Sequence, residues 1–325
     1  MSRFARLAAA TAALLASTSF AAHAFDGVVA SIKPVHSLVS AVMQGVGEPA
    51  LIVRSTGSEH VYALRPSDAR ALEAAKLVFW VGPGMETFLD DAIDTLATGA
   101  EVVALGDAPG LATLPFREGG PFEAHEHGDD HDHDHAGHHD HDDGDHDGHA
   151  HAAHDLHVWL DPMNAKVLVA TIENRLSEAD PANAARYRAN AEAYAQRLDT
   201  LVNEVEAEVA PVRDRPVVVF HDAYQYFEKR FGINVVGSIT VSPEVIPGAQ
   251  RVAEIRAKVR ELGAACVFAE PQFEPKLVSV VTEGTDARTG VLDPLGADLA
   301  DGPDLYLDLI RNLATSLTAC LREAS

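Results

Sequence analysis

Most of the histidines in this sequence, the residues with the clearest capacity for chemistry, lie in one acidic tract. Residues 123–155 contain twelve of the chain's 17 histidines together with twelve Asp or Glu, and no Lys or Arg. Neutral imidazole is a good ligand for zinc and other borderline metals, and neighbouring carboxylates concentrate cations around it. The composition therefore predicts an auxiliary metal-binding tract. Its candidate ligands are His125, His127, His131, His133, His135, His138, His139, His141, His146, His149, His151 and His154.

The tract also has an alternative interpretation, as a solvated acidic linker that binds no metal in function. A linker needs charge but has no need of imidazole, which favours the metal-binding interpretation. In either case the tract can bury too little apolar surface to offset the entropy cost of ordering it. We therefore expect residues 123–155 to form a disordered loop.

A second set of candidate ligands lies outside the tract. After residue 24, the remaining histidines of the chain are His36, His60, His157 and His221. Three imidazoles and one carboxylate would complete a tetrahedral zinc site, and Asp293 or Glu59 could supply the carboxylate. Each histidine alone could instead be an ordinary hydrogen-bonded loop residue. We expect His36 to be a non-ligand.

Two further carboxylates stand close to these histidines in the sequence. Asp222 follows His221 directly, and Asp161 lies four residues after His157. Either carboxylate could orient a ligating imidazole from outside the metal's own ligand shell. Each could equally cap the first turn of a helix.

The elements that must position these residues alternate between short β-rich runs and helical periods. Strands are expected at residues 27–32, 50–55, 76–81, 101–105, 215–220, 233–238, 264–269 and 290–292. Helices are expected at residues 34–44, 66–75, 85–97, 164–177, 181–209, 225–231, 248–262, 274–286 and 304–321. This alternation predicts an α/β fold whose two halves each carry a four-stranded, mostly parallel sheet flanked by helices.

The stretch at residues 181–209 contains no Gly or Pro after its opening proline. A helix over this stretch would be roughly 43 Å long at the usual rise per residue. It carries many charged and alanine residues, which suits an element that crosses between the two halves. An ordinary long surface helix is the other interpretation.

The candidate ligands fall where open α/β sheets bind ligands, beyond the carboxyl ends of the strands. Glu59 and His60 lie in the loop after the second expected strand, and His221 directly follows the fifth. Asp293 directly follows the eighth strand, and His157 lies just before a helix. This joint placement indicates one shared metal site in a cleft between the halves.

The amino-terminal residues 1–24 have the pattern of a secretory signal peptide. Arg3 and Arg6 form a short basic start, residues 7–20 are apolar, and residues 22–24 are a small-residue cleavage box. The apolar run is too short to span a bilayer comfortably, which argues against a transmembrane anchor. We expect the mature protein to be exported and to have no segment inserted in the membrane.

The formal net charge is −24 at pH 7. A surface this acidic argues against nucleic acid or an anionic membrane as a partner.

The only two cysteines are Cys266 and Cys320. In an exported protein such a pair is expected to form a disulfide, although two buried thiols are the alternative.

Four motifs together resemble the zinc-binding receptors of bacterial ABC importers, the ZnuA type of the cluster A-I metal-binding family. They are GSEHVYALRPSD at residues 57–68, HVWLDP at 157–162, FHDAY at 220–224 and VLDPLG at 291–296. The resemblance runs from about residue 25 to the carboxyl terminus, with the histidine-rich insertion before the second motif.

The resemblance implies two similar lobes joined by a long, rigid helix, with Zn²⁺ held at their interface as the transported ligand. The lobes would be residues 25–165 and 213–325, with connecting helices at 166–212. The resemblance also implies that the cysteine pair is the disulfide of some zinc-type members, and that the tract is an auxiliary zinc binder. We expect a monomer in the periplasm that delivers zinc to a membrane permease.

The ligands implied by the resemblance are His60, His157 and His221. Manganese-type relatives have Glu in place of His221, and a third imidazole favours zinc over harder cations. The fourth position varies between a carboxylate and water, and both Asp293 and Glu59 match carboxylates used by relatives. The fourth ligand therefore remains open.

Two other functions compete with zinc delivery. A periplasmic zinc buffer or chaperone would act mainly through the tract, with the lobes as a carrier. A zinc hydrolase would need a metal-bound water and a base such as Glu59, but the sequence contains no HExxH or GxSxG motif. The tract could also pass zinc inward to His157, which it directly precedes.

Overall fold

The computed structural model describes residues 24–54, 57–117, 122, 154–240, 248–261, 263–273 and 276–322. The predicted signal peptide lies outside the described residues apart from Ala24. The same is true of the histidine-rich tract apart from His154 and Asp155. Eleven of the twelve candidate tract ligands, those from His125 to His151, therefore also lie outside the described residues.

The first lobe is built on a four-stranded parallel sheet in the order β2-β1-β3-β4. Its strands are β1 (Val28–Ala30), β2 (Ala50–Leu51), β3 (Leu77–Trp80) and β4 (Glu101–Ala104). The central strands β1 and β3 are buried along their whole length and are apolar throughout. Such continuous apolar runs are typical of parallel strands covered on both faces.

The second lobe repeats this topology with a parallel sheet in the order β6-β5-β7-β8. Its strands are β5 (Val217–His221), β6 (Val235–Thr240), β7 (Cys266–Ala269) and β8 (Arg288–Val291). The central strand β5 is buried at every residue. The prediction of two α/β halves with parallel sheets is thus confirmed.

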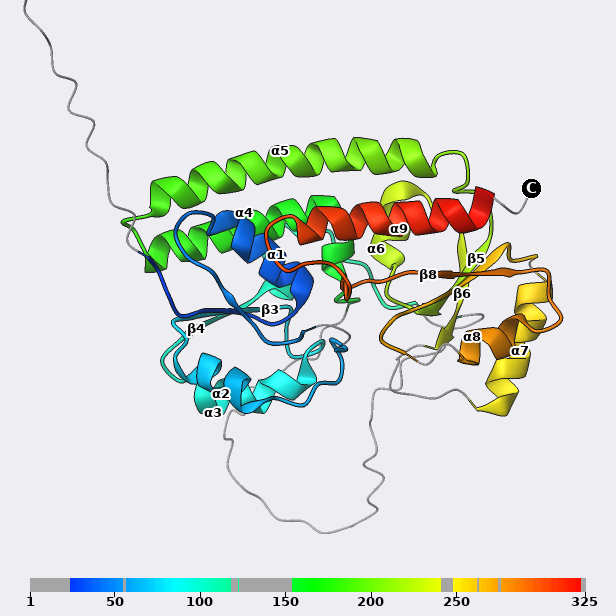
Figure 1. Cartoon of the computed structure of the whole chain (residues 1–325), viewed down its shortest axis with the longest axis horizontal. Helices are drawn as coiled ribbons and strands as arrows, with labels where there is room; N and C mark the ends of the chain where they lie inside the picture. Colours follow the sequence, from blue (N-terminus) through cyan, green and yellow to red (C-terminus); the bar gives the residue numbers. More distant parts are fainter. Residues whose placement is uncertain are drawn as a thin grey trace, which may run out of the picture.

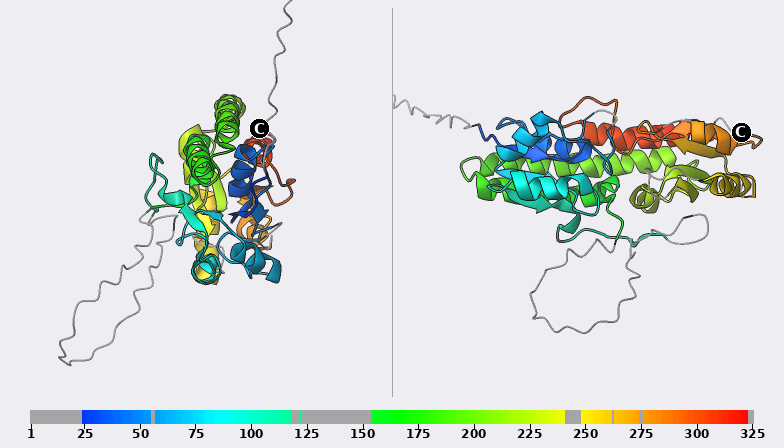
Figure 2. Two further views of the ribbon diagram at one scale, coloured as in Figure 1. Left: turned by 90° about the vertical axis from the view of Figure 1, so that its left-hand side faces the viewer. Right: turned by 90° about the horizontal axis from the view of Figure 1, so that it is seen from below.

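The helices lie around the sheets and along one side of the molecule (Figure 1 and Figure 2). In the first lobe they are α1 (Lys33–Val42), α2 (Pro66–Glu73) and α3 (Asp90–Leu96). In the second they are α6 (Gln225–Phe231), α7 (Ala249–Glu261) and α8 (Lys276–Thr282). The long helices α4 (Pro162–Ala179), α5 (Ala184–Val209) and α9 (Leu305–Arg322) complete the set.

The connecting helix α5 runs across both lobes at the top of Figure 1. Its buried side chains recur every three or four residues, and they are Tyr187, Ala191, Tyr194, Leu198, Leu201, Val205 and Val209. This stripe packs against α4 and α9. One continuous core therefore reaches from the first sheet through the connector to the second sheet, while a smaller apolar cluster lies under α7 and α8.

The carboxyl-terminal helix α9 packs against α1 of the first lobe as well as α5. At its start, the Tyr306 backbone N–H donates to Ser37 Oγ at 2.9 Å. At its other end, Cys320 forms a disulfide with Cys266 of β7, which confirms the predicted pairing. Helix α9 thus links the two lobes, and the lobe limits at residues 165 and 213 remain a prediction.

The boundaries of most predicted helices are shifted by one to three residues, and two predicted helices are much shorter in the structure. The stretch predicted at residues 85–97 is a 3-10 turn (Thr87–Leu89) followed by the shorter helix α3. Among the described residues of the stretch predicted at 274–286, the helix is α8, and Gly284 beyond it has a φ of 68°, the left-handed region that ends helices.

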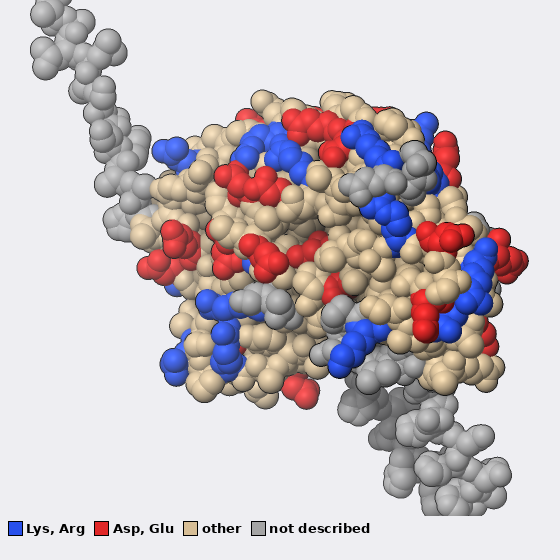
Figure 3. Space-filling model, turned by 45° about the vertical axis from the view of Figure 1, so that its right-hand side comes forward, with Lys and Arg blue, Asp and Glu red and all other residues tan. Residues whose placement is uncertain are grey.

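On the face shown in Figure 3, Lys and Arg side chains are interspersed with Asp and Glu among the coloured residues. No helix within the described part of the chain is long and apolar enough to cross a membrane.

Candidate metal centre

The loop that carries Glu59 and His60 is fixed at both of its ends. Gly57 packs so closely that a Cβ there would lie 2.8 Å from Val53 Cγ1, so any side chain would force a shift. At the other end, Pro66 opens α2 and the buried Asp68 accepts a 2.9 Å hydrogen bond from the Arg65 N–H. The loop after β2 is thereby held over the carboxyl end of the first sheet.

His157 precedes a 3-10 turn (Val158–Leu160) that is anchored on both sides. The buried Trp159 donates from Nε1 to the Pro294 carbonyl at 2.9 Å, and its own carbonyl accepts from Tyr306 Oη at 2.6 Å. Asp161 caps α4 by accepting from the Met163 N–H at 2.8 Å. The conformation of the HVWLDP motif is therefore set by its own capping and by the carboxyl-terminal segment.

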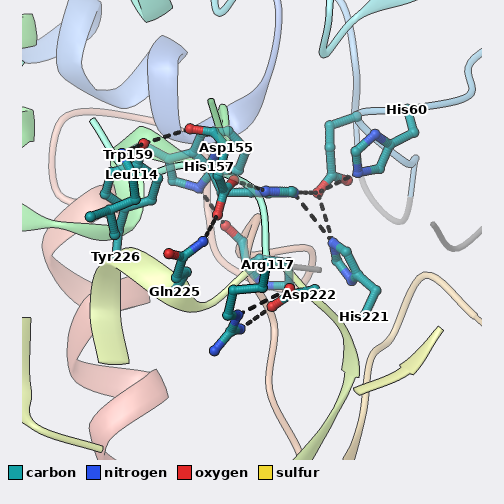
Figure 4. Close-up of polar contacts among 12 residues, drawn as sticks. His60, Leu114, Arg117, Asp155, His157, Trp159, His221, Asp222, Gln225 and Tyr226 are labelled. Carbon is teal, nitrogen blue, oxygen red and sulfur yellow. Dashed lines mark hydrogen bonds and ion pairs between the residues drawn. The ribbon is translucent and has the colours of Figure 1, made fainter. Parts of the chain in front are cut away.

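His221 is the last residue of β5, one residue inside the strand rather than just after it. Because strand β5 lies in the second lobe and His60 in the first, the two residues face each other across the lobe boundary. His157 completes the group from the segment before α4, as the close-up in Figure 4 shows.

The three imidazoles converge on one carboxylate oxygen. Oε1 of Glu59 lies 4.0 Å from Nε2 of His60, 4.0 Å from Nε2 of His157 and 4.0 Å from Nε2 of His221. The Nε2 atoms of His157 and His221 are 3.4 Å apart, and all four ligand atoms lie within 4.8 Å of one another. Tetrahedral zinc with nitrogen ligands needs edges of about 3.3 Å, so a small contraction of this group would close on the ion.

The group is largely buried. Glu59 and His221 are each 1% exposed, and His157 is buried beside them. His60 is the most accessible of the four residues. Ligands held in such a pocket are screened little by solvent, so they act strongly on an ion within it.

Two carboxylates orient the imidazoles from behind. Asp155 Oδ1 lies 2.7 Å from Nδ1 of His157, and Glu270 Oε2 lies 2.7 Å from Nδ1 of His221. Each carboxylate is placed to accept a hydrogen bond from Nδ1–H, which orients Nε2 toward the centre, where it can bind a metal once that nitrogen is deprotonated. Both residues were missed as orienting carboxylates by sequence reasoning, which proposed Asp161 and Asp222 instead.

The two proposed outer carboxylates serve other contacts. Asp161 caps α4 and pairs with Arg230 at 2.6 Å. Asp222 pairs with Arg117, which also binds Glu228 at 2.6 Å. Glu270 follows β7 directly, so the strand-end rule that singled out the histidines would have found it. Asp155 is the last of twelve acidic residues in the tract, so composition alone does not distinguish it from its neighbours.

The carboxylates set the charge of His221 in the metal-free site. Burial alone would lower the pKa of His221, but the nearby Glu270, Glu59 and Asp222 raise its pKa to about 9. Burial raises the pKa of Asp155 to about 6, although the hydrogen bond from the His157 N–H acts to lower this pKa. The metal-free site therefore holds a proton that a bound cation would displace.

The rival carboxylate Asp293 is engaged elsewhere. Its Oδ1 accepts from the N–H groups of Leu295 and Gly296 at 3.1 and 3.0 Å, and Oδ2 accepts from Ala297 at 2.6 Å. The metal-competent group found among the described residues contains Glu59 and not Asp293. His36 is also outside this group, with Nε2 hydrogen-bonded to the Pro49 carbonyl at 3.0 Å.

Among the described residues, Glu59 and the three histidines offer four ligand atoms within 4.8 Å of one another, a number that suits a closed metal-binding site. Structural zinc sites have four protein ligands, whereas catalytic sites keep one position open for water. The donor set of three imidazoles and one carboxylate fits zinc better than the oxygen-preferring Mg²⁺ and Ca²⁺.

Most of this chain is similar to known proteins. Residues 28–320 match the family model described as ZnuA, zinc-uptake complex component A, periplasmic. The high-affinity zinc uptake system protein ZnuA of Brucella abortus (strain 2308) is 64% identical over 306 residues, covering 91% of this chain and 92% of its own. The protein of the same description from Yersinia pestis is 38% identical over 316 residues, covering 95% and 97%.

Solved structures support the fold. The structure described as a 138–173 ZnuA deletion mutant with zinc bound has a TM-score of 0.70 at 20% identity, covering 91% of this chain and 98% of its own. The periplasmic zinc-binding protein TroA from Treponema pallidum has a TM-score of 0.72 at 20% identity, covering 90% and 98%. From the family match and the identity to both curated relatives, the chain belongs to the ZnuA family of periplasmic zinc-uptake components.

Proposed function

We propose that this protein captures Zn²⁺ in the periplasm and delivers it to the permease of an ABC-type importer. The family is one of binding components of zinc uptake, so the protein is not an enzyme, and we assign it no catalytic residue. The observation that carries the proposal is the placement of Glu59 Oε1 at 4.0 Å from three buried or half-buried imidazole nitrogens.

In this proposal His60, His157 and His221 bind zinc through Nε2 and Glu59 supplies the fourth ligand. Support comes from the edges of the group, which approach those of a zinc tetrahedron, and from the two carboxylates that orient the imidazoles. Asp293 is the less favoured fourth ligand, because its oxygens already accept three backbone N–H groups.

The test is a zinc titration in competition with a chelator of known affinity, on protein lacking residues 123–153. We expect this shortened protein to bind one zinc tightly and His60→Ala to weaken that binding by several orders of magnitude. His36→Ala is the matched control, because His36 is a buried histidine of the same lobe that lies outside the group. If removal of the tract by itself abolished tight binding, the result would favour a zinc buffer that acts through the tract.

Release of the ion is proposed to require separation of the lobes. His60 belongs to the first lobe and His221 to the second, so separation would remove at least one ligand. We expect the permease to accelerate zinc dissociation from this protein. A dissociation rate unchanged by docking to the permease in detergent would contradict that step.

We also infer that residues 1–24 direct export and that the mature protein acts as a monomer. The pattern of a basic start, an apolar run and a small-residue box supports the first inference. Edman sequencing of the secreted protein should begin at Phe25. Light scattering after size-exclusion chromatography should give one chain, with and without zinc.

A further inference from the structure

The segments that flank the histidine-rich tract are paired and bound to the second lobe. We call them the stem, defined as Leu114 to Arg117 before the tract and Asp155, the last residue of the tract. The Asp155 N–H donates to the Leu114 carbonyl at 2.9 Å, so the two segments run side by side. The stem lies against α6, which starts four residues after the zinc ligand His221.

Tyr226 of α6 joins both halves of the stem with one buried hydroxyl group. Tyr226 Oη accepts from the Leu114 N–H at 3.1 Å and donates to the Asp155 carbonyl at 2.6 Å (Figure 4). Because both contacts are with buried backbone groups, loss of this hydroxyl would leave them without that partner. Tyr226 therefore ties the stem to the second lobe at the residue that orients His157.

Two residues, Gln225 and Arg117, make further contacts that hold the stem to the second lobe. Gln225 donates to the Pro115 carbonyl at 3.1 Å and to Asp155 Oδ2 at 3.3 Å. Arg117 pairs with Asp222 and Glu228. Helix α6 thus contacts both the backbone and the carboxylate of Asp155, while the other oxygen of that carboxylate lies 2.7 Å from Nδ1 of His157.

We propose that Tyr226 is a positioning residue of the zinc site, which acts on His157 through Asp155. A helix of the second lobe then fixes the orientation of a ligand that precedes α4, in addition to carrying its own ligand His221. Separation of the lobes would withdraw Tyr226 and Gln225 from Asp155 and free the His157 ring. The affinity for zinc would consequently be highest only while the hydrogen bonds between α6 and the stem are formed. This inference rests on the proposed zinc site.

The predicted signature is kinetic and spectroscopic. Outer contacts of metal ligands commonly change metal affinity about 10–100-fold, and Tyr226 acts one contact further out. We expect Tyr226→Phe to raise the zinc dissociation rate about five- to tenfold. The visible absorption bands of the Co²⁺-loaded protein should broaden or shift, because the His157 ring is less constrained.

The experiment measures zinc dissociation into excess chelator by stopped flow, and the Co²⁺ spectrum, for wild type and variants. Tyr187→Phe is the control, since this buried hydroxyl donates to Asp180 at 2.8 Å at the far end of α5. It should lower thermal stability to a similar extent while leaving the rate and the spectrum unchanged. An equal change of the rate in both tyrosine variants would overturn the proposal.

A double-mutant cycle tests the route through Asp155. If Tyr226 acts through Asp155, Tyr226→Phe should have little further effect on the dissociation rate in an Asp155→Asn background. Full additivity of the two changes would show that Tyr226 does not act through Asp155. Failure of wild-type protein to bind zinc tightly would instead sink the proposed function, so the two failures are distinguishable.

Discussion

Glu270 and His221 form a buried carboxylate–imidazole pair in which Oε1 and Oε2 lie 2.8 and 2.7 Å from Nδ1. The residues come from neighbouring strands, His221 at the end of β5 and Glu270 directly after β7. Because parallel strands end at the same edge of a sheet, the topology itself brings the carboxylate behind the imidazole. The pair fixes which nitrogen of His221 is free for a metal.

The first prediction concerns the proton on His221. Its pKa of about 9 in the metal-free protein means that zinc must displace a proton below that pH. We expect zinc binding to release this proton at pH 7 to 8, and apparent affinity to rise with pH up to about 9. Calorimetric titrations in buffers of different ionisation enthalpy measure the release. Proton release that stays constant up to pH 10 would contradict this assignment.

The same pKa makes an independent prediction for the metal-free protein. A raised histidine pKa stabilises the folded state fully below the ordinary histidine pKa of 6.5, and this contribution disappears as pH rises through about 9. The melting temperature without zinc should therefore fall between these pH values. Zinc-saturated protein should show no such decline from His221, because the bound ligand is already neutral.

The second prediction concerns Glu270 itself. Glu270→Gln should weaken zinc binding by about 10–100-fold, as loss of an orienting carboxylate usually does. It should also move the pKa of His221 back toward lower values, since Glu270 makes the largest raising contribution. Glu283→Gln is a suitable control, because Glu283 is an exposed partner of Arg256 in the same lobe. Equal affinities for both variants would count against the orienting role.

The sequence predicts the two sheets and the grouped histidines, but not the orienting roles of Glu270 and Asp155. The alternation of β-rich and helical runs was sufficient to predict both parallel sheets, and the strand-end rule was sufficient to group His60 and His221. The same rule marks Glu270, which directly follows β7, but the sequence prediction used it only for the histidines, Glu59 and Asp293. Asp155 resembles its acidic neighbours in composition, and only burial against α6 distinguishes it.

The sequence could not separate Glu59 from Asp293 as the fourth ligand, for a different reason. Both residues follow strands, and both are carboxylates, so pattern and chemistry treat them alike. What separates them is the local backbone, because the chain after Asp293 turns back and presents three N–H groups to its oxygens. Such a turn depends on tertiary contacts, including that of Pro294 with Trp159, which sequence alone does not specify.

The third prediction separates these two carboxylates by experiment. Glu59→Gln should reduce zinc affinity by at least tenfold with little loss of thermal stability, because a charged ligand is replaced by a neutral one. Asp293→Asn should mainly lower stability, by about 1–3 kcal/mol, because backbone N–H groups lose an ionised acceptor. Chelator competition and thermal unfolding of both variants give the answer. The reverse pattern would make Asp293 the fourth ligand.

The fourth prediction concerns the disulfide between Cys266 and Cys320, which closes a loop with a sequence separation of 54 residues. The chain-entropy relation gives about 4 kcal/mol for a loop of this length, and measured values commonly fall below it. We expect Cys266→Ser with Cys320→Ser to lower the free energy of unfolding by about 2–4 kcal/mol. Zinc affinity should change by less than threefold. A large loss of affinity would show that β7 must be held by the disulfide to present Glu270.

The last prediction compares two deletions of equal length. Removal of residues 121–153 leaves His154 and Asp155 in place, whereas removal of residues 123–155 takes away the carboxylate that orients His157. The hydrogen bond from the Asp155 N–H to the Leu114 carbonyl holds the two sides of the stem together in the intact protein, and a short Gly-Ser linker replaces the removed residues in each variant. We expect the first deletion to retain wild-type affinity at the folded site and the second to lose about 10–100-fold. Equal affinities in the two shortened proteins would show that Asp155 is dispensable and that the stem serves only to attach the tract.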